Sequence, residues 1–259
     1  MTEPWRFIQN GFNNASANMA IDEAILISRT QGSVPNTIRF YQWKPSAVSL
    51  GFSQQAEKEI DIRTCRSLGI EIVRRPTGGG AVYHDSNGEL TYSIVVDMEE
   101  VPYDLISSYG RLCHGIILAC RELGLEAQLS VDETGRRCPN ITVSRKKISG
   151  GAQTRRGKIL LQHGTLLVDS NLDIMTKILK MGRPSACMPL DRLQSKVTTL
   201  RSILGRPISH YEIADSLRRG FEQALNVNLL KQDLTSDELK IASELCVRKY
   251  DTDEWNFKR

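Results

Sequence analysis

The stretch RRPTGGGAVYHD, residues 74–85, joins two arginines to three consecutive glycines. Glycine has no side chain, so the backbone N–H groups of residues 78–80 can turn toward an anion. Arg74 and Arg75 can add charge-assisted hydrogen bonds in fork geometry. The stretch therefore predicts a loop that binds a phosphate or a carboxylate, although neither of the common nucleotide loops, G-x-x-x-x-G-K-[ST] and G-x-G-x-x-G, is present. The alternative is a tight turn between two strands with solvated arginines.

A second basic cluster, VSRKKISGGAQTRRGK at residues 143–158, surrounds a Gly-Gly pair. If Val143 and Ile148 point into the core across a short turn, at least one lysine is held at the edge of the sheet. A lysine ammonium is a compact donor for negative charge that develops on a carbonyl or phosphate oxygen. A solvated hairpin with a basic tip is the alternative, but two basic glycine loops in one chain favour an anionic ligand.

Histidines and cysteines give weaker signals. His163 either contacts a ligand or has a structural role beside a glycine. His84 and Asp85 either bind a nucleotide or a metal, or they cap the next turn. The sequence contains no H-x-x-x-H spacing and no C-x-x-C pair among its six cysteines, so we expect no permanent metal site and no disulfide scaffold.

The composition is that of an ordinary soluble globular protein, with 259 residues, 40% apolar residues and 25% charged residues. The sequence lacks an apolar stretch of about 18 residues and a basic-then-apolar N-terminus, so we expect a cytoplasmic protein with no membrane partner. The net charge of +4 comes from acidic and basic residues that are mixed along the chain. The charge pattern gives no support for a nucleic-acid partner.

Helices and strands alternate along the part of the chain that must position these residues. Apolar residues at helical spacing predict helices, and short β-branched or aromatic runs predict strands. Helices are expected at residues 16–29, 57–69 and 102–125, and strands at 37–43, 46–52, 70–75 and 89–96, with further short strands and hairpin turns between 126 and 170.

The final third of the sequence predicts helices. SHYE at residues 209–212 and TSDE at residues 235–238 each place Glu three residues after Ser or Thr, which is the capping-box pattern. The whole pattern predicts one α+β domain over residues 1–259, in which mixed or antiparallel sheets are flanked by helices. A helical C-terminal part is expected at about residues 205–259.

Three stretches, RRPTGGGAVYHD, KKISGGAQ and HGTLLVD, resemble in their order and spacing the lipoate–protein ligase and octanoyltransferase family. The resemblance extends from NMAIDEAIL through SKVTTL to the terminal KYDTDEWNFKR. It implies the catalytic-domain fold of biotin and lipoate ligases. The chain stops where the C-terminal accessory domain of two-domain ligases would begin, so a separate accessory-domain chain is one candidate partner.

The ligase branch that this sequence resembles activates lipoate or octanoate with ATP and Mg²⁺ to an acyl-adenylate. It then transfers the acyl group to a lysine of a lipoyl carrier domain, in a 2-oxoacid dehydrogenase subunit or a protein like the glycine-cleavage H protein. The loop GGG-A-V-Y-H-D favours this branch, so our first expectation is an ATP-dependent lipoate–protein ligase. Lys147 matches the family's essential lysine, which contacts the acyl carbonyl and the α-phosphate. The substrate- and adenylate-binding residues that the resemblance implies are Arg74, Arg75, Thr77, Gly78, Gly79, Gly80, Ala81, His84, Asp85, Ser149, Gly150, Gly151, Ala152, His163 and Gly164.

The transferase branch instead holds the acyl chain as a thioester on a cysteine and passes it between carriers. Cys138 is the candidate nucleophile, and the adjacent Arg136 and Arg137 could lower its pKa. Cys138 lies closer to Lys147 in sequence than we expect for this branch, and the GGR variant of the loop is absent. An incidental thiol is the alternative interpretation of Cys138.

A binding module that recognises lipoyl domains without catalysis is a hypothesis of another class. Lys147 and both glycine loops are retained, which favours an enzyme. A biotin–protein ligase shares the expected fold but has a different glycine-rich signature, so it ranks third, after the ligase and the transferase.

Overall fold

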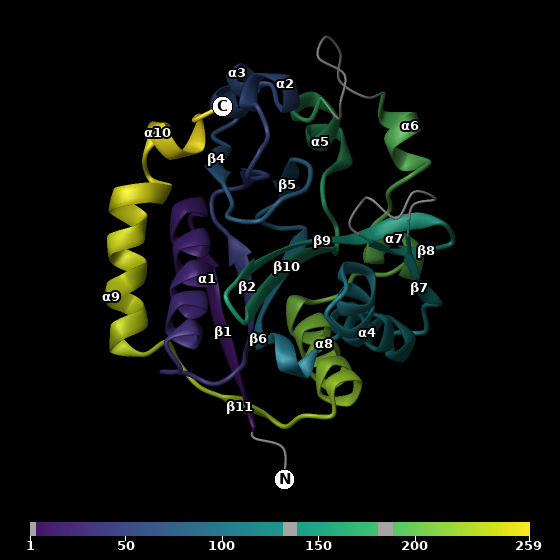
Figure 1. Cartoon of the computed structure of the whole chain (residues 1–259). Coiled ribbons are helices and arrows are strands. Elements are labelled where there is room, and N and C mark those ends of the chain that lie inside the picture. The colour runs from purple at the N-terminus through teal and green to yellow at the C-terminus, as the bar shows by residue number, and fades with distance from the viewer. Residues whose placement is uncertain (1–3, 132–138, 181–188) are drawn as a thin grey trace.

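The computed structural model describes residues 4–131, 139–180 and 189–259. Among these residues, an eight-stranded mixed sheet runs in the order β11-β1-β2-β6-β10-β9-β8-β7 (Figure 1). β1 pairs in parallel with β11 and β2, whereas the other neighbours are antiparallel. The strands are β1 (Trp5–Asn13), β2 (Thr37–Trp43), β6 (Glu89–Asp97), β7 (Ala127–Ser130), β8 (Asn140–Val143), β9 (Lys146–Arg156), β10 (Ile159–Leu167) and β11 (Leu229–Lys231).

A smaller sheet of three strands in the described part of the chain has the order β4-β3-β5. β3 pairs in parallel with β4 and antiparallel with β5. The chain therefore leaves β4, passes through the Pro-Thr-Gly-Gly-Gly segment and returns as β5. Short helices cover this sheet and bury its apolar residues. The elements of this part are β3 (Ala47–Leu50), β4 (Glu71–Arg74), β5 (Val82–His84), α2 (Ala56–Glu59), α3 (Ile62–Ser67), α5 (Leu172–Ile178) and α6 (Leu190–Gln194).

Helix pairs cover the two faces of the large sheet (Figure 1). α1 and α9 lie on one face, where Ile8, Val95 and Leu161 point into their core. α4 and α8 lie on the other face, where Phe40 and Ile94 point. Neighbouring strand residues thus alternate between two apolar cores. The remaining helices and turns are α1 (Ala15–Thr30), α4 (Leu105–Glu122), α7 (Leu200–Leu204), α8 (His210–Leu225), α9 (Ser236–Leu245), α10 (Asp253–Asn256), the 3₁₀ turn η1 (Met98–Glu100) and the π-helical turn η2 (Cys246–Tyr250).

This mixed sheet flanked by helices confirms the predicted α+β class. The capping box before α9 is present, because Thr235 accepts from the Glu238 N–H and Glu238 accepts from the Thr235 N–H. Both expected hairpins are present as well. One connects β8 to β9 through Ser144 and Arg145, which have positive φ values of 49° and 64°. The other connects β9 to β10.

The C-terminal part contains a strand as well as helices. β11 pairs with β1, and Trp5 lies opposite Leu229 in the register. Three residues are too few to show the alternation that identifies a strand from sequence, and this strand lies at the edge of the sheet. The C-terminal part that we expected to be helical therefore also contains the strand β11, which the sequence pattern did not predict.

No helix in the described ranges combines the length and the apolar character that crossing a bilayer requires.

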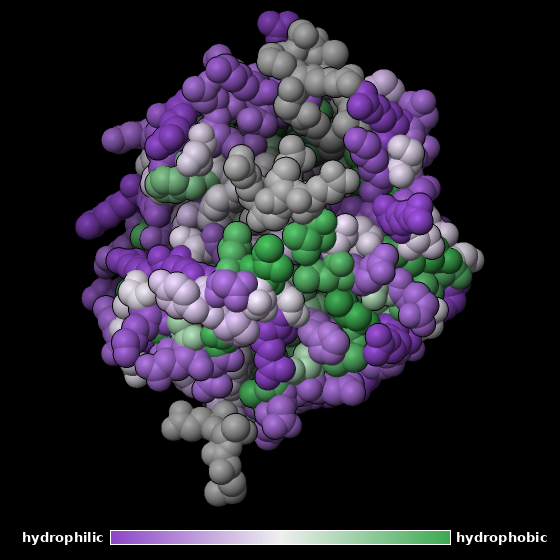
Figure 2. All heavy atoms as spheres, turned by 45° about the vertical axis from the view of Figure 1, so that its right-hand side comes forward, coloured by the Kyte–Doolittle hydropathy of each residue, from purple (hydrophilic) through white to green (hydrophobic). Residues whose placement is uncertain are grey.

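Figure 2 shows apolar side chains gathered near the centre of one face, surrounded by hydrophilic ones. Leu105 and Ile106 at the start of α4 are 40% and 38% exposed, and Val131 after β7 is 39% exposed.

Two glycines allow α4 and α8 to pack at very short distance. A Cβ atom on Gly220 of α8 would lie 2.2 Å from the backbone oxygen of Gly115 in α4. A Cβ atom on Gly115 would lie 2.4 Å from the Phe221 ring. The obstacle for Gly220 is backbone, which cannot move away without separating the helices.

We predict that Gly220→Ala lowers the free energy of unfolding by about 1–3 kcal/mol, because overpacking of this contact outweighs the better helix propensity of alanine. Chemical denaturation measures the change. Gly110→Ala is the matched control, since its Cβ would meet only Leu129 at an ordinary 3.7 Å. The control should be neutral or stabilising by up to about 1 kcal/mol. Equal effects of the two substitutions would contradict the packing argument.

Candidate active site

A cavity of about 580 Å³ lies between the small sheet, α1 and strands β9 and β10. This volume falls within the range of small-molecule sites. Both predicted glycine loops contribute to its wall, so the structure brings the two basic clusters together at one cavity. The sequence-predicted residues that line it are Arg75, Gly79, Gly80, Ala81, His84, Lys147, Gly150, Gly151, Ala152, His163 and Gly164.

Arg75 holds the glycine loop from inside. Its Nη2 donates to the backbone oxygens of Gly78 and Gly80 at 2.6 and 2.7 Å. Gly79, between them, has a positive φ of 88°. The loop also packs closely on the end of β3, because a Cβ atom on Gly51 would lie 2.0 Å from the Gly79 oxygen. Gly79 and Gly51 are therefore required by a fixed loop conformation, as expected for a close approach, whereas a Cβ atom on Gly78 or Gly80 would meet nothing within 4 Å.

Arg74 differs from the sequence expectation, because the structure does not place it among the residues that line the cavity. Its side chain is fully buried and donates to the backbone oxygens of Gly51, Gln54 and Asn256. The Trp255 indole returns a hydrogen bond to the Arg74 oxygen. Adjacent residues of a strand point to opposite sides, so Arg75 reaches the loop while Arg74 reaches α10.

His163 is held by a buried carboxylate from α1. Its Nδ1 lies 3.0 Å from Asp22, and its Nε2 lies 2.7 Å from the Thr77 hydroxyl. Burial lowers the pKa of His163 more than the Asp22 carboxylate raises it, so the imidazole is neutral at pH 7. Burial raises the pKa of Asp22, but Arg39 and His163 outweigh this and lower it overall. His163 lines the cavity in a defined orientation, and Thr77 supports it from behind.

His84 has a similar arrangement on the other side of the loop. Its Nδ1 lies 2.8 Å from Glu89, and its Nε2 lies 2.8 Å from the Ser49 hydroxyl. The ring also stacks on Trp43 with centroids 3.9 Å apart. The neighbouring Asp85 accepts backbone N–H groups of Asn87 and Asn171 and does not line the cavity. Of the two expectations for Asp85, its hydrogen bonds match the turn-capping one.

Lys147 stands at the cavity wall near the start of β9. Its backbone is fixed on both sides, since its N–H donates to the Lys196 oxygen and its oxygen accepts from Thr198. A Cβ atom on Gly150 would lie 2.4 Å from the Lys147 ammonium and 3.3 Å from the Asn140 side-chain oxygen. Gly150 therefore provides the space that the lysine side chain crosses.

Close pairing of β9 and β10 explains the glycines in these strands. A Cβ atom on Gly164 would lie 2.5 Å from the Tyr92 hydroxyl and 2.6 Å from the Gly150 oxygen. Ser149, which was also assigned to the site, is buried and lies outside the cavity wall.

The sequence analysis missed the apolar wall of the cavity. It is built from residues of several elements that are far apart in sequence, and each of them looks like an ordinary core residue. The apolar lining residues missed are Met19, Val82, Leu167, Met175, Leu179 and Val197, and the others include Tyr41, Trp43, Ser49, Tyr83, Thr91 and Asn140. Some of these residues nevertheless lie inside stretches that the sequence singles out, such as Tyr83 in RRPTGGGAVYHD, Leu167 in HGTLLVD and Met19 in NMAIDEAIL.

The described cysteines lie outside this cavity. Burial raises the pKa of Cys65 and of Cys120 to about 12 and that of Cys246 to about 11. Cys113 of α4 is buried and contacts Tyr92 of β6 and Gln162 of β10. Cys138, the candidate nucleophile, lies outside the described residues, as does Cys187.

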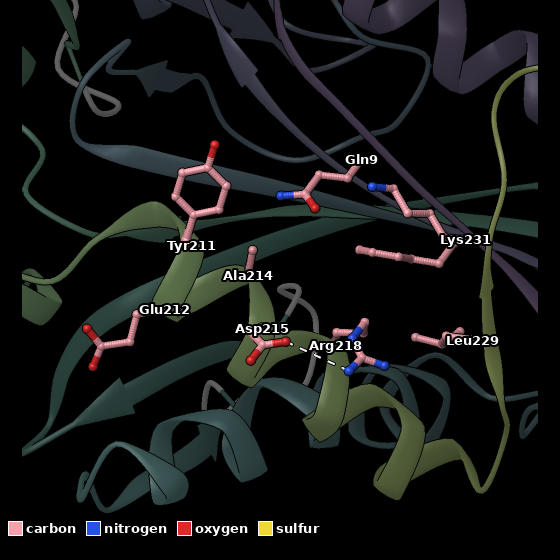
Figure 3. Close-up of a pocket in the computed structure, with 9 residues that line it drawn as sticks. Gln9, Tyr211, Glu212, Ala214, Asp215, Arg218, Leu229 and Lys231 are labelled. Atoms are coloured by element: carbon pink, nitrogen blue, oxygen red, sulfur yellow. Dashed lines mark ion pairs between the residues drawn. The ribbon is translucent and has the colours of Figure 1, made fainter.

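A second cavity of about 530 Å³ lies between α8, β1 and β11. Figure 3 shows side chains such as Gln9, Tyr211 and Lys231 around it, and an ion pair between Asp215 and Arg218 within α8. None of the described residues that the sequence analysis assigned to the site lines this cavity. The first cavity is therefore the candidate active site.

The lipoyl protein ligase A/B catalytic domain family matches residues 14–222. The chain belongs to this family. The octanoyltransferase LipM of Symbiobacterium thermophilum is 37% identical over 100% of both chains. The enzymes of the same name from Anoxybacillus flavithermus and Bacillus subtilis are 36% and 32% identical, each with 99% of both chains covered.

Solved structures with the same fold are lipoate–protein ligases. A lipoate–protein ligase A bound with ATP superposes with a TM-score of 0.86 and 29% identity, covering 98% of this chain and 99% of that one. A bi-partite ligase from Thermoplasma acidophilum has a TM-score of 0.84 and 28% identity, covering 98% and 96%. These likenesses confirm the lipoate ligase fold.

The expectation of an ATP-dependent lipoate–protein ligase is wrong. Full-length relatives at 32–37% identity are octanoyltransferases, whereas the ligases of known structure named above share 28–29%. The fold is shared with the ligases, so it could not distinguish the reactions. The absence of a GGR variant, which favoured the ligase, was too small a signal to separate the branches.

We predict that Gly79→Ala destabilises the protein by about 1–2 kcal/mol, because alanine disfavours a positive φ. The new Cβ would also lie 3.0 Å from Arg75 Nη2. Denaturant titration measures the loss. Gly78→Ala is the control within the same loop, since its Cβ meets nothing within 4 Å. A destabilised Gly78→Ala with an unaffected Gly79→Ala would show that the loop conformation is different.

Proposed function

We propose that this enzyme transfers an octanoyl group between carrier proteins through a thioester on Cys138. The end-to-end match with octanoyltransferases carries this proposal. A cavity with an apolar wall and a lysine at its rim supports it. The acceptor is a lysine of a lipoyl carrier domain, the partner named with the related Thermoplasma acidophilum ligase.

Cys138 is the best placed cysteine in sequence. It stands two residues before Asn140, which lines the cavity. This short separation in sequence supports the choice of Cys138 as the nucleophile. Cys187 is eight residues from Leu179 and ten from Val197, which are the lining residues nearest to it in sequence.

The reaction proceeds in two balanced steps. The Cys138 sulfur attacks the octanoyl thioester of the donor carrier, forms the acyl-enzyme and releases the donor thiol, which takes the proton from Cys138. The ε-amine of the acceptor lysine then attacks the acyl-enzyme, forms an amide and returns a proton to the Cys138 sulfur. Each step places negative charge on the acyl oxygen, and the Lys147 ammonium stabilises that charge and the thiolate.

The apolar side of the cavity suits the hydrocarbon chain. Met19 comes from α1, Leu167 from β10, and Met175 from α5. Methionine side chains are flexible and adapt to the shape of an alkyl group. The polar rim with Lys147 and Asn140 then lies at the end where the reacting carbonyl sits.

The test of the proposal is acyl transfer without ATP. We predict that the wild-type chain, mixed with an octanoyl-thioester carrier, gains one octanoyl group and passes it to an apo-lipoyl domain. Cys138→Ser should lose both steps because its hydroxyl is a far weaker nucleophile than a thiolate. Intact mass spectrometry of enzyme and acceptor measures both. Cys187→Ser is the control and should keep full activity; loading that survives Cys138→Ser would overturn the assignment.

Lys147 gives a second prediction. Lys147→Ala should slow acyl loading by about 10²–10³-fold, because a donor to the developing oxyanion is removed. Stopped reactions analysed by mass measure the rate. The neighbouring Lys146→Ala is the control, since Lys146 does not line the cavity. Near-normal loading by Lys147→Ala would contradict the role of this lysine.

A further inference from the structure

Arg75 has partners within the chain for all of its N–H groups. A guanidinium has five N–H groups. Nε donates to the Thr77 hydroxyl, Nη1 to the Ser49 hydroxyl and backbone oxygen, and Nη2 to the oxygens of Gly78 and Gly80. The side chain is only 4% exposed. Its hydrogen bonds are therefore directed at the loop and its support.

The Nε side of Arg75 ends at a buried carboxylate. Thr77 accepts from Nε at 3.1 Å and lies 2.7 Å from His163 Nε2. His163 Nδ1 lies 3.0 Å from Asp22. A carboxylate can only accept, so His163 carries its proton on Nδ1 and Nε2 accepts from Thr77. This order leaves the Thr77 oxygen lone pairs for Arg75.

The Nη1 side of Arg75 is also followed by a hydroxyl, a histidine and a buried carboxylate. Ser49 accepts from Nη1 at 3.1 Å and lies 2.8 Å from His84 Nε2. His84 Nδ1 lies 2.8 Å from the fully buried Glu89. Two carboxylate–histidine–hydroxyl arrays, from different elements, thus converge on one guanidinium.

The two arrays are anchored in the large sheet and its helix. Asp22 of α1 also accepts from Arg39 at 2.7 Å and from the Ser93 hydroxyl at 2.8 Å. Glu89 also accepts from the Thr91 hydroxyl at 2.6 Å. Buried hydrogen-bonded networks of this kind fix side-chain orientation, although Glu89 Oε2 has no hydrogen-bond partner among the described residues. The orientation of Arg75 is therefore set by the sheet.

The conformation of the glycine loop depends on Arg75. In a trans peptide the N–H points opposite to the C=O of the preceding residue. Because Arg75 holds the oxygens of Gly78 and Gly80, the N–H groups of Gly79 and Ala81 point away from the guanidinium. Both residues line the cavity. Their peptide planes are thus fixed before any ligand enters.

We propose that Thr77 and Ser49 are positioning residues, whose hydroxyls orient Arg75 and through it the Gly78–Gly80 loop for acyl transfer. The part of this inference that concerns rate rests on the proposed function. The part that concerns the loop does not. Neither hydroxyl is required to touch the acyl group.

The experiment uses a matched pair of threonines. Thr77→Val keeps the shape and removes the hydroxyl, and Thr77→Ser keeps the hydroxyl. Thr37→Val is the control, because Thr37 is also buried and also accepts from an arginine Nε, that of Arg6, at 3.1 Å. Thr37 lies in β2 and does not line the cavity.

Hydrogen exchange reports on the loop without any reaction. We expect Thr77→Val to speed amide exchange in the peptide over residues 74–83 about tenfold, since a buried hydrogen bond is lost. Thr37→Val should leave this peptide unchanged, and Thr77→Ser should restore slow exchange. Ser49→Ala should loosen the same peptide through the other array. Unchanged exchange in both Thr77→Val and Ser49→Ala would overturn the proposal.

Octanoyl loading of Cys138 reports on the site. We expect Thr77→Val to lower kcat about 100-fold with a smaller change in KM. The reason is that a displaced loop slows the chemical step more than it weakens substrate binding. Thr37→Val should load at the wild-type rate. Equal loading by Thr77→Val and Thr37→Val would show that Thr77 serves stability alone and would end the proposal. A wild-type chain that takes up no octanoyl group from the octanoyl-thioester carrier would refute the proposed function, and the exchange data would still decide the role of Thr77.

Discussion

Burial of the Asp22 carboxylate is the interaction on which the site depends. This one side chain of α1 accepts hydrogen bonds from Arg39 and Tyr41 of β2, Ser93 of β6 and His163 of β10. It therefore joins a helix to three strands of the sheet. Removing one partner of a buried ion pair typically costs about 3–5 kcal/mol, because the other charge stays without compensation. The position of His163 is thus tied to the stability of the whole sheet.

The same scaffold serves two different reactions within this family. An ATP-bound ligase superposes closely on this chain, yet the full-length relatives are octanoyltransferases. A shared fold does not determine the chemistry, which depends on groups placed at the site. The proposed acyl cavity with Lys147 in its wall would suit both an acyl-adenylate and an acyl thioester. In our proposal, the Cys138 thiol distinguishes the two reactions.

Much of the fold could be predicted from the sequence because it depends on local patterns. The capping box at Thr235, the hairpin at Ser144 and Arg145, and the long helix before Gly124 are all encoded within a few neighbouring residues. The short edge strand β11 could not be predicted, since its three residues gain their conformation from β1. Tertiary pairing of this kind leaves no local signal.

The site could be predicted where a motif carries it and not where packing does. The glycine loops were predicted because their residue types are unusual at that spacing, and Lys147 was predicted because it matches the essential lysine of the family that the sequence resembles. The apolar wall was missed, since Met175 and Leu179 differ in no way from core residues until the fold is known. Arg74 and Arg75 are adjacent and identical in type, and only the side of the strand decides that one faces α10 and the other the loop.

The contact between Arg74 and α10 links residues that are more than 180 positions apart in sequence. Contacts of such long range close large loops and form late in folding. During synthesis, β4 and the glycines that follow it leave the ribosome long before Trp255 and Asn256 exist. The segment that carries the glycine loop thus gains its contact with α10 only once almost the entire polypeptide has been made. The candidate active site is therefore completed at a stage when the rest of the sheet can already be in place.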